Sequence, residues 1–83
     1  MPLYMDVHKK VAGANAKTVA DAHMKDVEVQ ERYGVKYLRY WVDERTGTVF
    51  CLCDAPSAEL AARVHREAHG LVADEIHEVK EGA

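Results

Sequence analysis

The sequence has few cysteines, prolines and aromatic residues, and it has no long apolar run. Its two cysteines, Cys51 and Cys53, are two positions apart on a predicted strand. Their Cα atoms would be about 6.5 Å apart, at the upper end for a disulfide, so we expect reduced thiols. No apolar stretch approaches the ~18 residues of a membrane span, and no apolar leader follows the first methionine. These absences favour a cytoplasmic protein without a membrane partner.

The chain also lacks an excess of positive charge. Its formal net charge is -3 at pH 7, and no basic stripe with interleaved aromatic residues compensates. Nucleic acid is therefore not an expected partner. With 83 residues, the chain is long enough for one domain spanning 1–83, and its small core favours support from a partner subunit.

The common catalytic motifs are missing as well. The sequence contains no glycine-rich phosphate loop and no Gly-x-Ser-x-Gly elbow. No base lies close in sequence to Cys51 or Cys53, as a nucleophilic thiol would require. We therefore expect a binding protein rather than an enzyme.

Periodicity divides the chain into strands and helices. A two-residue period predicts a strand, and apolar residues at helical spacing predict a helix. We expect a strand at 3–8, a helix at 16–33, a hairpin of strands at 35–43 and 48–53, a helix capped by Ser57 and ended by Gly70, and a strand at 73–80. This order predicts an α+β, ferredoxin-like βαββαβ fold, with an antiparallel sheet and both helices on one face.

Strand alternation divides the sheet residues into two sets. The more apolar set, expected beneath the helices, is Leu3, Met5, Val7, Leu38, Tyr40, Val42, Phe50, Leu52 and Ile76. The other set, expected on the open face, is Tyr4, Asp6, His8, Tyr37, Arg39, Trp41, Val49, Cys51, Cys53, His77 and Val79. That second set is too apolar for water and too polar for a dry core, so we expect a homodimer interface, a ligand pocket, or both.

The strongest functional signal is the pair His65 and His69 on the second helix. Residues four apart lie on one helix face, where two imidazoles can bind one metal ion. We expect both rings at the edge of the buried stripe, partly exposed and adjacent. The alternative is that they are boundary histidines, one of which complements the helix dipole. The order His-Glu-x-x-His is absent, which disfavours a hydrolytic zinc site.

Further donors lie elsewhere in the chain. His23 is expected on the sheet-facing side of the first helix, with Asp26 and Gln30 as orienting partners, either as a ligand or as a hydrogen-bonded interior residue. A second set can converge because its strands are neighbours in this fold: Asp6, His8, Cys51, Cys53 and His77. Thiolate and imidazole donors suit nickel, copper(I) or zinc, although a buried cysteine is commonly only a small apolar residue.

Several segments resemble a known family. They are the opening residues 1–8, the segment 22–30, the run 33–43 with Tyr-Leu-Arg-Tyr-Trp, and the stretch 64–76 with Val-His-Arg-Glu-Ala-His-Gly. Together they resemble the small nickel-binding-like proteins of actinobacteria, otherwise described as a domain of unknown function. The similarity spans essentially the whole chain.

This resemblance implies a dimeric ferredoxin-like fold and nickel(II) binding, for sequestration rather than catalysis. Matching by residue type and position gives His65 and His69 as the first candidate ligands, followed by His8 and His23. His77 is a poorer match. The Cys-x-x-Cys loop of the ferredoxin-like copper chaperones is absent, so their transfer mechanism does not follow.

Three functional hypotheses result. The leading one is a cytoplasmic homodimer that binds nickel(II) through surface or interfacial imidazoles, with zinc, cobalt and copper as competing ions. The second is a small dimeric α/β-barrel enzyme, an oxygenase or isomerase, with the open sheet face as its pocket and His8, His23 and Tyr37 as acid-base residues. The third is a regulatory or assembly module with incidental histidines, which predicts neither a metal nor a pocket of about 300 Å³ or more.

Overall fold

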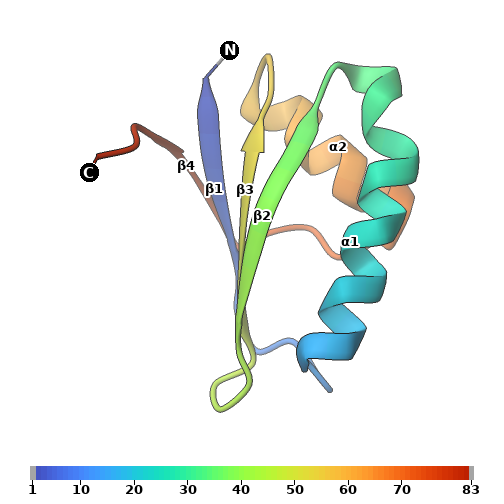
Figure 1. Cartoon of the computed structure of the whole chain (residues 1–83), viewed down its shortest axis with the longest axis vertical. Helices are drawn as coiled ribbons and strands as arrows, with labels where there is room; N and C mark the ends of the chain where they lie inside the picture. The colour runs from blue at the N-terminus through green and yellow to red at the C-terminus, as the bar shows by residue number, and fades with distance from the viewer. Residues whose placement is uncertain (1, 83) are drawn as a thin grey trace.

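The computed structural model describes residues 2–82 as a four-stranded antiparallel sheet with both helices on one side (Figure 1). The elements are β1 (Leu3–His8), α1 (Ala16–Gln30), the 3₁₀ turn η1 (Glu31–Tyr33), β2 (Lys36–Asp43), β3 (Thr48–Asp54), α2 (Ala58–Ala68) and β4 (Glu75–Val79). The sheet order is β2-β3-β1-β4, which confirms the expected βαββαβ, ferredoxin-like arrangement. Neither helix is long and apolar enough to cross a membrane.

Local signals explain where the helices begin and end. The Asn15 side chain accepts a hydrogen bond from the Thr18 amide, and the Thr18 hydroxyl accepts one from the Asn15 amide, so α1 begins with a capping box. Gly34 has a φ of 67°, a left-handed conformation that ends the helical segment after η1. Ser57 caps α2 as expected, because its hydroxyl accepts from the amide of Leu60.

The two faces of the sheet are largely the reverse of those expected. Beneath the helices lie Tyr4, Asp6, His8, Tyr37, Val49, Cys51 and Cys53, all assigned from sequence to the open face. Leu3, Met5, Val7, Phe50 and Leu52 alternate with these residues on β1 and β3 and occupy the open face. The prediction that the more apolar set lies beneath the helices is wrong for these residues. The polar side chains can be buried there because they find hydrogen-bonding partners on the helices.

Strand β2 is a mixed case because its register shifts between Tyr37 and Arg39. Tyr37 pairs with Cys53 and Tyr40 pairs with Cys51, so both tyrosines face the helices on either side of the irregularity. The expected positions of Tyr40, Val42 and Ile76 beneath the helices are therefore right, as are those of Arg39, Trp41, His77 and Val79 on the open face. Leu38, expected beneath the helices, is instead 39% exposed.

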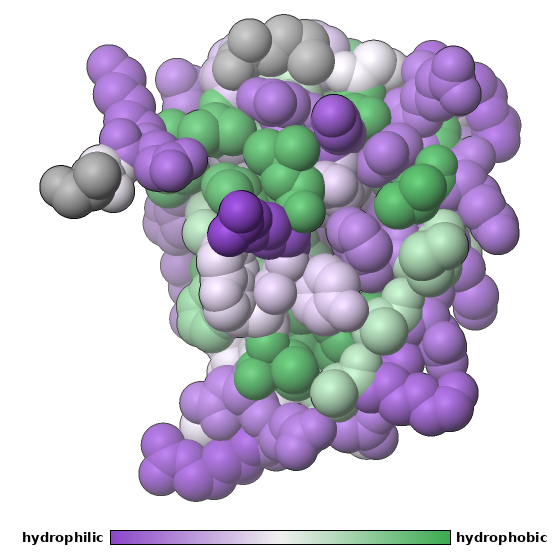
Figure 2. Space-filling view, viewed as in Figure 1, coloured by the Kyte–Doolittle hydropathy of each residue, from purple (hydrophilic) through white to green (hydrophobic). Residues whose placement is uncertain are grey.

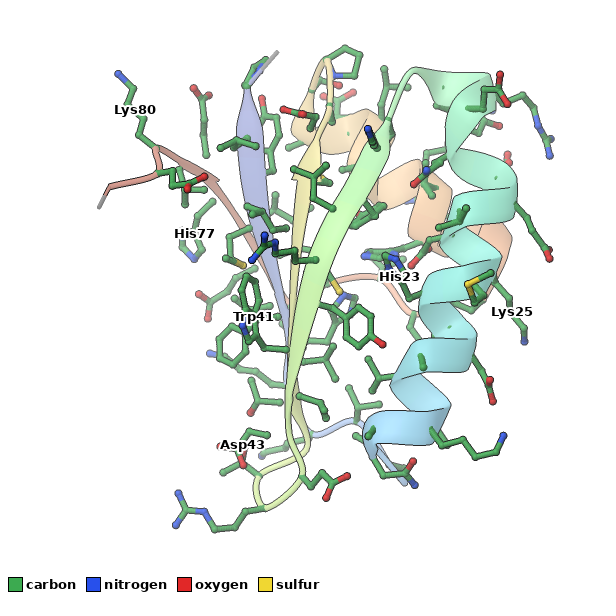
Figure 3. All side chains as sticks on the ribbon, in the orientation of Figure 1. His23, Lys25, Trp41, Asp43, His77 and Lys80 are labelled. Carbon is green, nitrogen blue, oxygen red and sulfur yellow. The ribbon has the colours of Figure 1, made fainter. Side chains whose placement is uncertain are left out.

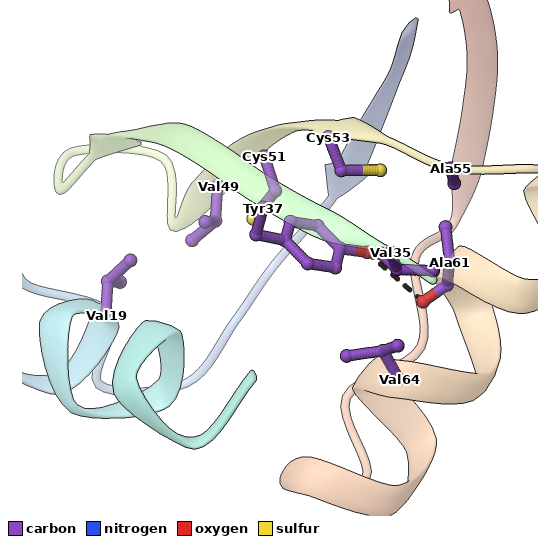
Figure 4. Packing of buried hydrophobic residues seen from close by; sticks show 9 residues of the cluster. All are labelled: Val19, Val35, Tyr37, Val49, Cys51, Cys53, Ala55, Ala61 and Val64. Atoms are coloured by element: carbon purple, nitrogen blue, oxygen red, sulfur yellow. Dashed lines mark hydrogen bonds between the residues drawn. The ribbon is translucent and has the colours of Figure 1, made fainter. Parts of the chain in front are cut away.

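The core is built from small residues gathered around one tyrosine (Figure 4). Its buried apolar members are Val19, Val35, Tyr37, Val49, Cys51, Cys53, Ala55, Ala61 and Val64. The Tyr37 hydroxyl donates to the carbonyl of Ala61, a contact that joins β2 to α2. Beside this core, the loop after β1 packs on the hairpin, where the Val11 amide donates to the carbonyl of Gly47. A Cβ at Gly47 would lie 3.1 Å from the Val11 oxygen, so this close approach requires glycine.

A buried histidine and aspartate cluster

A cluster of charged and polar side chains lies between the sheet and the helices. Asp6 and His8 come from β1, Asp26 comes from α1, and His65 comes from α2. All four side chains are buried, and His65 is only 1% exposed. Because isolated buried charges are strongly disfavoured, each of these groups needs a partner, and each has one.

His65 is the centre of the cluster. Its Nδ1 lies 2.8 Å from Asp26 Oδ1, and its Nε2 lies 2.9 Å from Asp6 Oδ2. Since carboxylates only accept hydrogen bonds, both ring nitrogens donate and the ring is an imidazolium. Burial by itself lowers the pKa of His65, but the hydrogen bonds to Asp26 and Asp6 outweigh burial and raise that pKa to about 11. One positive charge therefore joins two buried carboxylates.

Each carboxylate has further donors. Asp6 accepts from the Tyr37 hydroxyl at 2.9 Å and lies 3.1 Å from His8 Nε2. Burial alone would raise the pKa of Asp6, but the hydrogen bonds from His65 and His8 hold it well below its usual value. Asp26 is also 3.0 Å from His69 Nε2, and the same balance lowers its pKa. Both aspartates are therefore ionised at neutral pH.

The histidine pair predicted from sequence is present, with one correction. The rings of His65 and His69 are adjacent, with centroids 4.9 Å apart. The expectation that both would be partly exposed is wrong for His65, which is almost completely buried. The buried face of α2 consists of Ala61, Val64 and His65, so the face that meets the sheet is centred nearer His65 than expected.

Two groups of side chains have a geometry that could hold a metal ion. One is Asp26, His65 and His69, and the other is Asp6, His8, Cys51 and His65. Within each group the ligand atoms lie within 4.8 Å of one another. Donors bound side by side at ~2.1 Å from one ion lie about 3 Å apart, close to the separations at Asp26. Nitrogen, oxygen and sulfur donors together suit nickel, copper, zinc and cobalt.

The two groups share His65 but differ in burial. His65 faces Asp26 with Nδ1 and Asp6 with Nε2, so the groups lie on opposite sides of one ring. Every member of the Asp6 group is buried, and burial raises the pKa of the Cys51 thiol to about 11. His69 is only partly buried and lines a cavity that opens to solvent. His8, Cys51, Asp26 and His65 line the same cavity, and His69 is the one ligand candidate among these residues that is not fully buried.

His23 lies in the space between α1 and the sheet (Figure 3) and belongs to neither group. Its ring is tilted against that of Tyr40, with centroids 4.9 Å apart. The partners expected for it are engaged elsewhere. Asp26 contacts His65 of α2 and His69, which follows that helix, and the Gln30 side chain accepts from the Tyr37 amide.

The second predicted set converges only in part. Asp6, His8 and Cys51 do meet, and His65 joins them. Cys53 lies in the core outside this group, and burial raises the pKa of its thiol to about 12. His77 is on the far side of the sheet, away from the helices, where its Nε2 lies 2.9 Å from Glu75 (Figure 3). The prediction of two free thiols agrees with the structure.

The pocket assumed by the enzyme hypothesis does not contain its acid-base residues. A groove on the open face is lined by Leu3, Met5, Leu38, Arg39, Trp41, Leu52, Val79, Lys80 and Glu81. His8 and Tyr37 are buried beneath the helices, on the opposite side of the sheet. An active site on the open face built from these residues and His23 is therefore wrong.

Sequence reasoning missed the role of Asp26. A signal was present, since Asp26 lies seven residues after Val19, two helical turns along the same buried face of α1. A carboxylate at such a position needs a cationic or donor partner, and the histidines were the available candidates. Sequence spacing alone could not show that this partner comes from α2.

Fold and cluster together define a small ferredoxin-like domain with a buried histidine and aspartate site that could hold a metal ion. The chain belongs to the family described as "Nickel responsive protein SCO4226-like", whose profile matches residues 4–79. It is similar to the solved structure of SCO4226 from Streptomyces coelicolor A3(2), with 41% sequence identity and a TM-score of 0.90. That similarity covers 98% of this chain and 99% of the other. A search of curated proteins found no match.

Proposed function

We propose that this protein binds nickel(II) through the buried histidine and aspartate cluster, for sequestration in nickel homeostasis and without catalytic turnover. The convergence of two imidazoles on one carboxylate oxygen, Asp26 Oδ1, carries this proposal. The family description "nickel responsive" supports the choice of nickel. The free thiols of the chain fit a reducing, cytoplasmic location.

The group of Asp26, His65 and His69, which contains the partly buried His69, would be the first to hold an ion. A divalent ion there would replace the protons that now lie between the nitrogens and the carboxylate, so binding would release protons. Three protein donors leave coordination positions for water, or for donors from the Asp6 group after side-chain rotation. We therefore expect acid to weaken nickel binding, because protons compete for the imidazoles.

The substitution His69→Ala tests the site because it removes one candidate ligand and the contact of that ligand with Asp26, and it keeps the residues of the Asp6–His65–Asp26 contacts. We expect it to weaken nickel binding at least about tenfold, since loss of a direct ligand should cost no less than loss of a supporting contact. Isothermal titration calorimetry of the chelator-stripped protein, with nickel, zinc and cobalt in parallel, measures the effect.

His77→Ala is the matched control, because His77 is an exposed histidine on the other side of the sheet. It should bind nickel as the parent does. A parent protein that takes up no nickel would refute the proposed function. Equal losses in the two variants would place the ion elsewhere in the protein.

We also propose that the protein is a homodimer that pairs through the open face of the sheet. Figure 2 shows apolar residues gathered over the upper part of the sheet, on the side away from the helices. Leu38 and Trp41, which line the groove on this face, are 39% and 47% exposed. Arg39 and Glu81 line the same groove with opposite charges, which suits a face that must complement a copy of itself.

Trp41→Lys is expected to convert the dimer to a monomer, because two lysines would be buried against an apolar face. Sedimentation velocity across a range of concentrations measures the change. Met24→Lys is the control, because Met24 is 59% exposed on α1, away from that face. The interface assignment fails if the parent is monomeric at every concentration, or if Met24→Lys dissociates it as well.

A further inference from the structure

We propose that the cavity between α1 and the sheet binds a small uncharged aromatic molecule that carries one hydroxyl group, of the size of a phenol. The cavity shares the walls of the histidine cluster, but the proposed binding does not require an ion. This organic ligand site is additional to the proposed metal site.

The size and walls of the cavity suit a single ring. Its volume is about 130 Å³, and it opens to solvent on one side. A cavity of ~150 Å³ lined by apolar side chains is known to hold benzene. Most of the lining here is apolar, with Val19 and Ala22 from α1 facing Tyr40 and Val49 from the sheet. The ring of a ligand would replace water against these walls.

His23 provides the polar contact. It lines the cavity, and within residues 2–82 its side chain makes no hydrogen bond. Figure 3 shows it in the space between α1 and the sheet. Among the other polar side chains of the lining, His8, Asp26, His65 and His69 are bonded within the cluster, and the Thr18 hydroxyl is bonded in the cap of α1. A hydroxyl group on the ligand could therefore pair with the His23 imidazole.

The charge of the cluster determines which polar group is accepted. Asp26 lines the cavity beside His65 and His69, and Asp6 lies behind them at Nε2 of His65. A further anion would be repelled there and would lose hydration against apolar walls. A neutral hydroxyl avoids both costs and still makes a hydrogen bond. The site should therefore discriminate a phenol from a benzoate of similar size.

Fluorine NMR titration of the metal-free protein provides the test, with 4-fluorophenol, fluorobenzene and 4-fluorobenzoate as probes. We expect saturable binding of 4-fluorophenol, binding of fluorobenzene about fivefold weaker for the loss of one hydrogen bond, and no binding of 4-fluorobenzoate. His23→Ala should remove the difference between the first two. Equal affinity of the parent for all three probes, or no saturable binding, would overturn the proposal.

Ala22→Leu places extra volume in the cavity, and Ala16→Leu makes the same change at an exposed position on α1 outside its lining. We expect the first to weaken 4-fluorophenol binding at least about tenfold and the second to leave it unchanged. Circular dichroism confirms that both variants are folded. If the Ala22→Leu protein does not fold, His23→Ala remains as the test of the proposed site. Loss of the preference for 4-fluorophenol over fluorobenzene in that variant would support the site, and persistence of the preference would refute it. Because no nickel is present, the outcome is independent of the proposed metal site.

Discussion

Replacing His65 with glutamine is expected to lower the free energy of unfolding of the metal-free protein by about 3 kcal/mol or more. The imidazolium now bridges two buried carboxylates, Asp6 and Asp26, with both ring nitrogens. Glutamine carries no charge and cannot donate to both carboxylates in that geometry. The loss is large against the 5–15 kcal/mol that stabilises a typical domain. Urea denaturation followed by circular dichroism measures it as a lower midpoint at constant slope.

The matched control is His23→Gln, on α1. His23 is half-buried and makes no side-chain hydrogen bond within residues 2–82. We expect this change to cost less than about 1 kcal/mol, the range of changes away from buried networks. Similar losses in the two variants would contradict the assignment of an ionic cluster centred on His65.

Raising the pH from about 7 to 8 is expected to destabilise the metal-free protein by about 1.4 kcal/mol per pH unit. The pKa of His65 is about 11 in the folded protein and 6.5 without its partners. Over this interval the folded state keeps the proton and the unfolded state has lost it. The contribution of His65 is therefore complete below pH 6.5 and declines as the pH rises toward 11. Urea titrations at several pH values, with chelator present, measure the slope.

At acid pH, stability changes with pH in the opposite direction. The pKa values of Asp6 and Asp26 are lowered from 3.8, so their contribution is complete above that value and is lost as the pH falls through the lowered pKa values. Maximum stability is therefore expected between about pH 4 and 6.5. In His65→Gln the decline from pH 7 to 8 should disappear, whereas the raised pKa values of the Cys51 and Cys53 thiols keep a decline near pH 9. A decline from pH 7 to 8 that persists unchanged in that variant would show that another group causes it.

These two results bear on the proposed nickel site. In the metal-free protein, the proton on His65 balances two carboxylates that would otherwise repel each other. A divalent ion beside Asp26 would supply that positive charge instead and would require the proton to leave. Nickel should therefore restore stability above pH 7, where the metal-free protein loses the contribution of the His65 proton. In the metal-free protein, the hydrogen bonds of the protonated His65 would keep the candidate ligands in position for the ion.

Much of the fold could be predicted from local sequence patterns. Alternation in Leu3–His8 predicted β1 with the observed bounds, and Ser57 and Gly34 marked helix ends that the structure contains. The spacing of His65 and His69 correctly predicted adjacent rings. Each of these signals acts over a few residues, because caps, turns and helical neighbours are formed by local backbone geometry.

Only the tertiary structure showed which face of the sheet is buried beneath the helices. The alternation on β1 is the same whichever face the helices cover, and only their side chains decide between the two. Asp6 could be buried because His65, 59 positions later, donates to it, and Asp26 because α2 packs beside α1. The sequence by itself therefore determined the elements, their order and the histidine pair. Tertiary packing decided which polar residues form the cluster, because burial of a charge depends on partners that are distant along the chain.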